Sequence, residues 1–147
     1  MSPKLHAAAG ALGLTLIATF WTSTVLVETL GTPTQVAAVK QAILYALALL
    51  IPSLALAGAG GARLARSHRG PVVATKTRRM RLAALNGVLI LVPSAVFLAS
   101  KAGAGALDTG FYAVQALELM AGAANFALLS ANMRDGMALV RRRQPVR

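Results

Sequence analysis

Two histidines and a methionine are the side chains of this sequence best suited to bind a metal-containing cofactor. His6 begins a long apolar run, His68 lies in the basic motif RSHRG, and Met80 follows in TRRMR. A neutral imidazole is a good axial ligand for haem iron, and a second histidine or a methionine can supply the other axial position. The sequence therefore predicts a haem b site in which His6 binds the metal and His68, Met80 or a second copy's His6 completes it.

Arginines accompany these candidate ligands. Arg78 and Arg79 directly precede Met80, and an arginine can bind a haem propionate through two parallel hydrogen bonds. A simpler interpretation is available for both histidines. His68 is then solvated or close to lipid headgroups, and His6 is an interfacial side chain that caps or snorkels.

A second set of polar residues lies inside the apolar runs and comprises Glu28, Lys40, Gln115 and Glu118. Gln115 and Glu118 are three residues apart and share one face of a helix. Ionisable groups in a membrane usually pair, and Lys40 is the expected partner of Glu118. The simplest interpretation is a structural ion pair that fixes helix register. The alternative is a site for a quinone headgroup or for a proton, which Glu118 accepts.

Four apolar segments must position these side chains. Hydrophobic residues make up 56% of the 147 residues and charged residues only 13%, and each segment satisfies the ~20 residues that a membrane-spanning helix needs. Backbone groups in lipid must pair within the segment, which favours helices. We therefore predict one integral membrane domain over residues 1–147, an all-α four-helix transmembrane bundle with spans at about 5–30, 36–64, 82–100 and 111–140.

The charges predict the orientation of this bundle. Of the 15 basic residues, 13 lie near the termini or in the connection 63–81. Cytoplasmic loops carry an excess of lysine and arginine, so we expect an up-down-up-down bundle with both termini in the cytoplasm of a bacterium and the spans in its inner membrane. The net charge of +11 then indicates anionic lipid of the cytoplasmic leaflet as a partner, and no nucleic acid is expected.

Several chemistries are excluded by residue type or by missing motifs. The sequence has no cysteine, so disulfides and thiolate metal sites are impossible. It also lacks a phosphate-binding P loop, a GxSxG motif and a metalloprotease HExxH motif. No catalytic residue is therefore predicted, and an enzyme is not the expected class. Small residues, as in AAAGALG and ALAGAGGA, permit close helix packing and favour a homo-oligomer or a subunit of a larger membrane complex.

Three segments carry a resemblance to a known group: VKQAILYALALLIP, LAALNGVLILVPSAVFL and FYAVQALEL with the following NFALL and NMRDG. At these segments the chain resembles small four-helix inner-membrane proteins of proteobacteria. The resemblance implies the topology but no activity. The similarity to membrane b-type cytochromes is one of architecture only. The resemblance also picks out the recurring polar positions His6, Lys40, Asn86, Gln115, Glu118 and Asn132.

Two functions of different class therefore follow from the sequence. The first is a b-type haem-binding or quinone-interacting electron-transfer protein. The second is a non-catalytic accessory or scaffold subunit of a membrane complex that binds anionic lipid.

Overall fold

A computed structural model describes residues 3–66 and 71–141 of the chain. Every long element in these two ranges is helical. The elements are α1 (Pro3–Leu30), α2 (Pro33–Arg66), α3 (Pro71–Asn86), the π-helical segment η1 (Gly87–Leu91), α4 (Val92–Gly103) and α5 (Thr109–Arg141). Because α3, η1 and α4 are continuous, the described residues form four long helical runs, each long and apolar enough to cross a membrane. The predicted all-α class with four apolar spans is confirmed.

Local sequence signals fix where α2 and α5 begin. The backbone N–H of Thr32 donates to Gln35 Oε1 at 2.8 Å, and the N–H of Gln35 donates to Thr32 Oγ1 at 3.3 Å. This reciprocal pair is a capping box. At α5, Asp108 Oδ1 accepts the N–H of Phe111 at 3.0 Å. Both caps satisfy helix N–H groups that have no partner within the helix.

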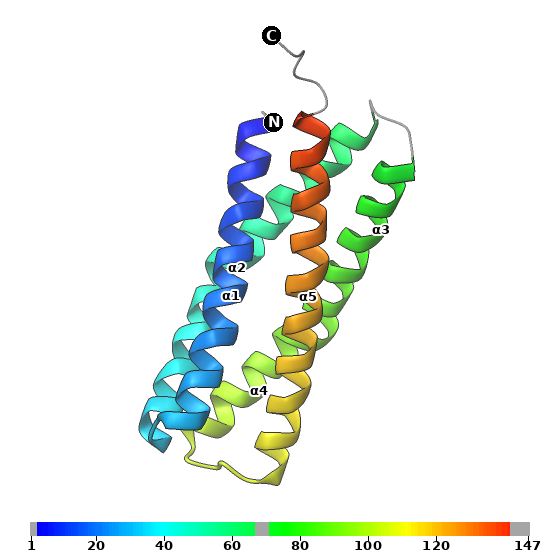
Figure 1. Cartoon of the computed structure of the whole chain (residues 1–147). Coiled ribbons are helices and arrows are strands. Elements are labelled where there is room, and N and C mark those ends of the chain that lie inside the picture. The colour runs from blue at the N-terminus through cyan, green and yellow to red at the C-terminus, as the bar shows by residue number, and fades with distance from the viewer. Residues whose placement is uncertain (1–2, 67–70, 142–147) are drawn as a thin grey trace.

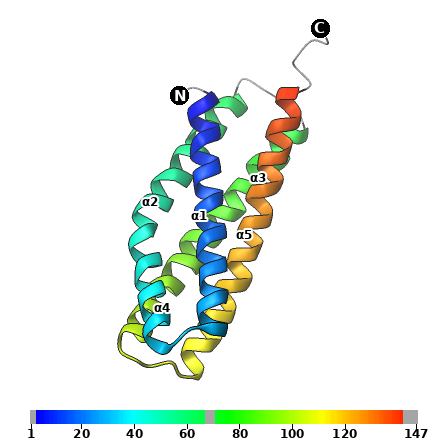
Figure 2. The ribbon, with the colours of Figure 1, turned by 60° about the vertical axis from the view of Figure 1, so that its left-hand side comes forward.

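The helical runs pack side by side as one bundle (Figures 1 and 2). The start of α1, the end of α2, the start of α3 and the end of α5 lie at one end, which we call the basic end. The α1–α2 and α4–α5 connections lie at the opposite end, which we call the link end. Helix α1 contacts α2 and α5, while α3 contacts α5 and α4 contacts both α2 and α5.

Two apolar clusters form the core. One lies toward the link end and contains Val27, Val36, Leu98, Ala102 and Phe111. The other lies farther from the link end and contains Ile17, Leu47, Leu50 and Ala95. Large apolar side chains also face outward, as expected for helices whose surroundings are lipid. Examples of these are Tyr45, Val88, Leu89 and Met120.

The third helical run begins earlier than the apolar pattern predicts. The sequence indicates a span from residue 82, whereas the helix starts at Pro71. Proline favours the first position of a helix, and the segment KTRRMRL that follows contains good helix formers but little apolar character. Hydropathy detects the apolar part of this helix alone. Residues 71–81 of the basic connection 63–81 are therefore helical although they precede the predicted span.

The two prolines within spans have different surroundings. Pro52 lies inside α2, where the hydroxyl of the following Ser53 donates to the carbonyl of Leu49 at 2.7 Å. Pro93 follows η1, where the N–H of Val92 reaches back to the carbonyl of Gly87. Proline has no N–H to donate, and in helices that span membranes a local π adjustment can satisfy the backbone group that is left free. The helix that contains Pro93 therefore changes type, from π-helical at Gly87–Leu91 to α-helical from Val92.

Candidate functional site

The most deeply buried charged side chain described is Lys40 of α2. Its side chain is 1% exposed, and Nζ lies 2.9 Å from Oε2 of Glu118 on α5, whose side chain is 14% exposed. The expected ion pair is therefore present. Removing one partner of such a pair leaves an uncompensated charge in a low-dielectric setting, so the contact ties α2 to α5.

Other polar groups surround this ion pair. Lys40 Nζ also lies 3.4 Å from Oγ1 of Thr24 on α1, and Gln115 Nε2 donates to Glu118 Oε2 at 3.2 Å. Glu28 lies one turn beyond Thr24 on α1, and its charge interacts with those of Lys40 and Glu118. We call these five residues from three helices the polar cluster: Thr24, Glu28, Lys40, Gln115 and Glu118.

The polar cluster is not fully satisfied. Within the described ranges, Oε1 of Glu28 and Oε1 of Gln115 are buried without a hydrogen-bond partner. Gln115 is only 4% exposed as a whole, so water gives little compensation there. The cluster contains two carboxylates and one ammonium, which leaves a net charge of −1 if all three are ionised. The cluster can therefore accept one further positive charge.

A second polar contact joins α3 to α5. Asn86 Nδ2 donates to the carbonyl of Ala121 at 2.8 Å and to Asn125 Oδ1 at 2.9 Å. Asn125, which is 1% exposed, donates from Nδ2 to the carbonyl of Ala83 at 3.2 Å. Side-chain hydrogen bonds of this kind hold membrane helices together. The sequence marks both asparagines as polar but does not identify their partners.

Trp21 makes the corresponding contact between α1 and α5. Its indole Nε1 donates to the carbonyl of Leu119 at 3.1 Å. A Cβ atom at Gly122 would lie 3.4 Å from Trp21 Cδ1, so the ring lies against a position where α5 has no side chain. Trp21 therefore packs within the bundle, although 38% of it stays exposed.

His6 joins α1 to α2 at the basic end. Its Nδ1 lies 2.9 Å from the carbonyl oxygen of Ala57, and its Cε1 is 3.5 Å from the Cβ position at Gly61. A ring held through one nitrogen by a backbone carbonyl is also the usual arrangement of a metal-binding histidine. His6 thus meets one requirement of a haem ligand.

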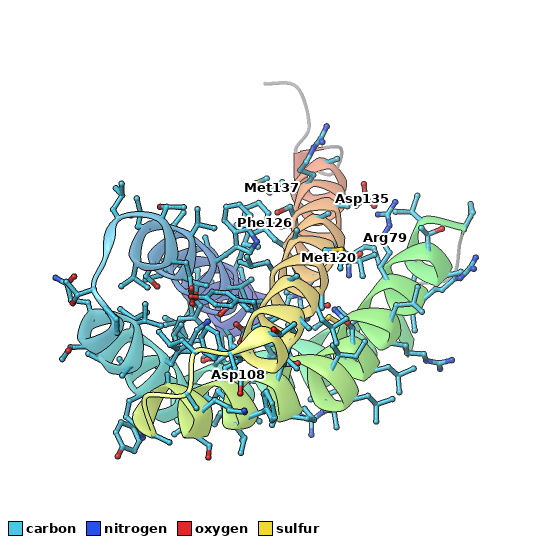
Figure 3. All side chains as sticks on the ribbon, turned by 90° about the horizontal axis from the view of Figure 1, so that it is seen from below. Arg79, Asp108, Met120, Phe126, Asp135 and Met137 are labelled. Atoms are coloured by element: carbon cyan, nitrogen blue, oxygen red, sulfur yellow. The ribbon has the colours of Figure 1, made fainter. Side chains whose placement is uncertain are left out.

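The remaining residues of the predicted haem site have other contacts. The terminal methyl group of Met80 lies 3.7 Å from the Cβ position at Gly58 of α2. Arg79 Nη1 pairs with Asp135 Oδ2 at 2.6 Å, and Figure 3 shows these side chains facing each other from α3 and α5. Arg78 is exposed, and His68 lies outside the described residues. The described part of the chain holds no group of three or more metal-binding side chains.

A shallow groove between the third helical run and α5 has no counterpart in the sequence predictions. Its volume is about 370 Å³, and its lining is apolar except for Ser94. The other lining residues are Leu89, Ile90, Pro93, Phe97, Val114 and Leu117. An outward-facing apolar groove looks in sequence like any other lipid-exposed surface, so composition gives no signal for it.

No protein-family model, curated protein or solved structure matches the chain. The candidate site is thus defined by its own geometry, in which polar side chains from every long helical run described bond to a neighbouring helix.

Proposed function

We propose that the chain is a non-catalytic accessory or scaffold subunit of the bacterial inner membrane. One observation carries this proposal: polar side chains within the bundle bond one helix to another, and α5 takes part in most of these bonds. Lys40, Trp21 and Asn86 connect α5 to α2, α1 and α3 respectively. A bundle whose polar groups are used in this way offers apolar outer faces for packing against a partner subunit or a second copy.

The proposed orientation places the basic end in the cytoplasm, with an up-down-up-down course and both termini inside. The basic end carries exposed lysines and arginines, and Asp135 is its one acidic residue in the sequence. Basic residues beside membrane spans face the cytoplasm. There they attract anionic headgroups, at ~1 kcal/mol for each lysine or arginine near the surface.

Native mass spectrometry of the full chain in detergent tests the lipid-binding part of this proposal. We expect the wild type to retain phosphatidylglycerol in preference to phosphatidylcholine. The triple variant Arg63→Gln, Arg78→Gln, Arg81→Gln should lose ~3 kcal/mol of attraction to anionic headgroups, at ~1 kcal/mol for each arginine. This corresponds to about a 100-fold loss of affinity for phosphatidylglycerol. Lys101→Gln, at the link end, is the matched control. The proposal is contradicted if the wild type retains both lipids equally, or if Lys101→Gln loses as much affinity for phosphatidylglycerol as the triple variant.

The subunit part is tested by the size of the native particle. Extracted gently from its own membranes, the protein is expected to migrate well above the size of one 15.1 kDa chain in its detergent micelle. A particle that contains one copy and nothing else contradicts the subunit role.

A second candidate function, electron transfer through haem b or a quinone, is favoured by the contact of His6 with Ala57. If Nδ1 donates to the carbonyl, Nε2 is left as the nitrogen that can bind iron. The second axial ligand would come from His68, Met80 or the His6 of a second copy. The groove beside Ser94 suits the apolar tail of a quinone.

The visible spectrum of the purified protein tests this candidate. Protein made in haem-replete cells is expected to show a Soret band that shifts on reduction and disappears in His6→Ala. Lys4→Ala, in the same turn of α1, is the control that retains the band. A colourless wild-type preparation eliminates the haem function and leaves the subunit proposal intact.

A further inference from the structure

The polar cluster has a property that a purely structural ion pair does not need. It brings two carboxylates, Glu28 and Glu118, together with one ammonium, Lys40. A net charge of −1 in a membrane-embedded bundle is expensive unless a positive charge neutralises it. The sole cation in the cluster is already bonded to Glu118.

The unpartnered atoms show what the cluster lacks. Both are oxygens, Glu28 Oε1 and Gln115 Oε1, and an ionised carboxylate can only accept hydrogen bonds. The cluster is therefore short of donors. A proton added to a carboxylate supplies an O–H donor and removes the excess negative charge at the same time.

The two carboxylates differ in how well they tolerate ionisation. Glu118 Oε2 accepts from both Lys40 Nζ and Gln115 Nε2, and such bonds favour the charged form. Glu28 Oε1 receives no bond. The additional proton therefore belongs on Glu28.

From these contacts we propose that Glu28 is a proton-binding site that holds one exchangeable proton at neutral pH. A hydronium ion from the solvent gives up the proton and becomes water, an O–H bond forms on the Glu28 carboxylate, and the charge of the cluster changes from −1 to zero. The site is independent of the subunit and haem proposals, because it needs only the bundle itself.

A metal cation fits the same cluster less well. The ammonium of Lys40 lies within the cluster and would repel Na⁺, whereas a covalently bound proton neutralises Glu28 on the carboxylate itself. Water can also reach the site. Glu28 is in the last turn of α1, close to the link end, and it is only partly buried. Exchange with solvent is therefore expected.

Infrared spectroscopy of glutamate-labelled protein tests this inference without relying on a mutation. The chain contains only two glutamates, Glu28 and Glu118, so ¹³C-carboxyl glutamate reports on these two groups alone. In vesicles at neutral pH we expect one labelled band from a protonated carboxyl group beside one from a carboxylate. The protonated band should shift in D₂O, disappear at high pH and be the same in sodium and choline chloride.

Matched variants assign the band. Glu28→Gln, which has the shape of the protonated acid, should remove it. Glu118→Gln alone would release Lys40 as a counter-ion for Glu28, so the control is the double variant Lys40→Met, Glu118→Gln, which should retain the band. The proposal is overturned if the wild type shows two carboxylates at neutral pH, or if sodium abolishes the band. It is also overturned if D₂O leaves the band unshifted, or if the band survives in Glu28→Gln.

Discussion

Lys40 on α2 and Glu118 on α5 form a buried ion pair with 2.9 Å between Nζ and Oε2. The two residues are far apart in the sequence and come from helices that both approach the link end. The lysine has no other carboxylate bonded to it among the described residues. Its burial therefore depends on Glu118, which makes the pair the most informative place to test the packing.

We predict that Lys40→Met destabilises the bundle more than the double variant Lys40→Met, Glu118→Gln. The single change leaves Glu118 without its cation, at a cost of about 3 kcal/mol, whereas the double change removes both charges. Unfolding in a mixed-detergent titration gives the four free energies of this cycle. If the losses of unfolding free energy in Lys40→Met and Glu118→Gln add up to the loss in the double variant, the pair contributes no coupling energy.

The hydrogen bonds of Asn125 between α3 and α5 should contribute less to stability than the ion pair does. Asn125→Ala removes the bond to the carbonyl of Ala83 and leaves Asn86 with one acceptor. We expect a loss of about 1 kcal/mol, within the range found for hydrogen bonds between membrane helices. Thr19→Ala is the control, because Thr19 is exposed and bonds only within its own helix. Equal losses in the two variants would mean that the α3–α5 bond adds no stability.

Two glycines of α1 provide a matched test of close packing. A Cβ atom at Gly13 would lie 2.6 Å from Leu54 Cδ2 on α2, whereas nothing lies within 4 Å of one at Gly10. Alanine is preferred over glycine in a helix by ~1 kcal/mol. Gly10→Ala should therefore unfold at least as late as the wild type, and Gly13→Ala should be less stable than Gly10→Ala because Leu54 must move. The same stability for both variants would place α1 and α2 farther apart than described.

Asp108, at the α4–α5 connection, should make the stability of the bundle depend on pH. The hydrogen bond from Lys101, followed by that from the Phe111 N–H, lowers the pKa of Asp108. Figure 3 shows Asp108 at this connection. Because the pKa of Asp108 is lower in the folded state, the ionised carboxylate stabilises the fold. This stabilisation is complete at a pH above the pKa of Asp108 in the unfolded chain, and it is lost as the pH falls through the pKa in the folded chain.

Asp108→Asn should remove this acid-dependent contribution, because asparagine still caps a helix but does not titrate. Thermal unfolding of both proteins across the acidic range measures the difference. Curves that remain parallel down to the lowest pH would assign the acid sensitivity to another group.

The sequence predicted more of the membrane architecture than of the contacts within it. Four apolar runs are visible directly, and Lys40 was identified as the partner of Glu118 because it was the best-placed cation inside a span. The partners of His6, Trp21 and Asn86 were not predictable, because each bonds to a backbone carbonyl. Every residue has such a carbonyl, so its position depends on how the helices pack.

Other features were hidden for different reasons. The helix from Pro71 passes through KTRRMRL, where no apolar pattern indicates a membrane segment. No pattern in the sequence indicates the π-helical turn from Gly87 to Leu91, which contacts α5. Glu28 was included in the polar set, although its lack of a donor became visible only from the three-dimensional arrangement.

Accessibility of single cysteines tests the proposed orientation most directly, because the chain has no cysteine of its own. Ala104 at the link end and Ala74 near the basic end are both exposed. In intact bacterial cells, a membrane-impermeant maleimide should label Ala104→Cys, whereas Ala74→Cys should react only after lysis. Labelling of Ala74→Cys in intact cells, or protection of Ala104→Cys until lysis, would contradict the account.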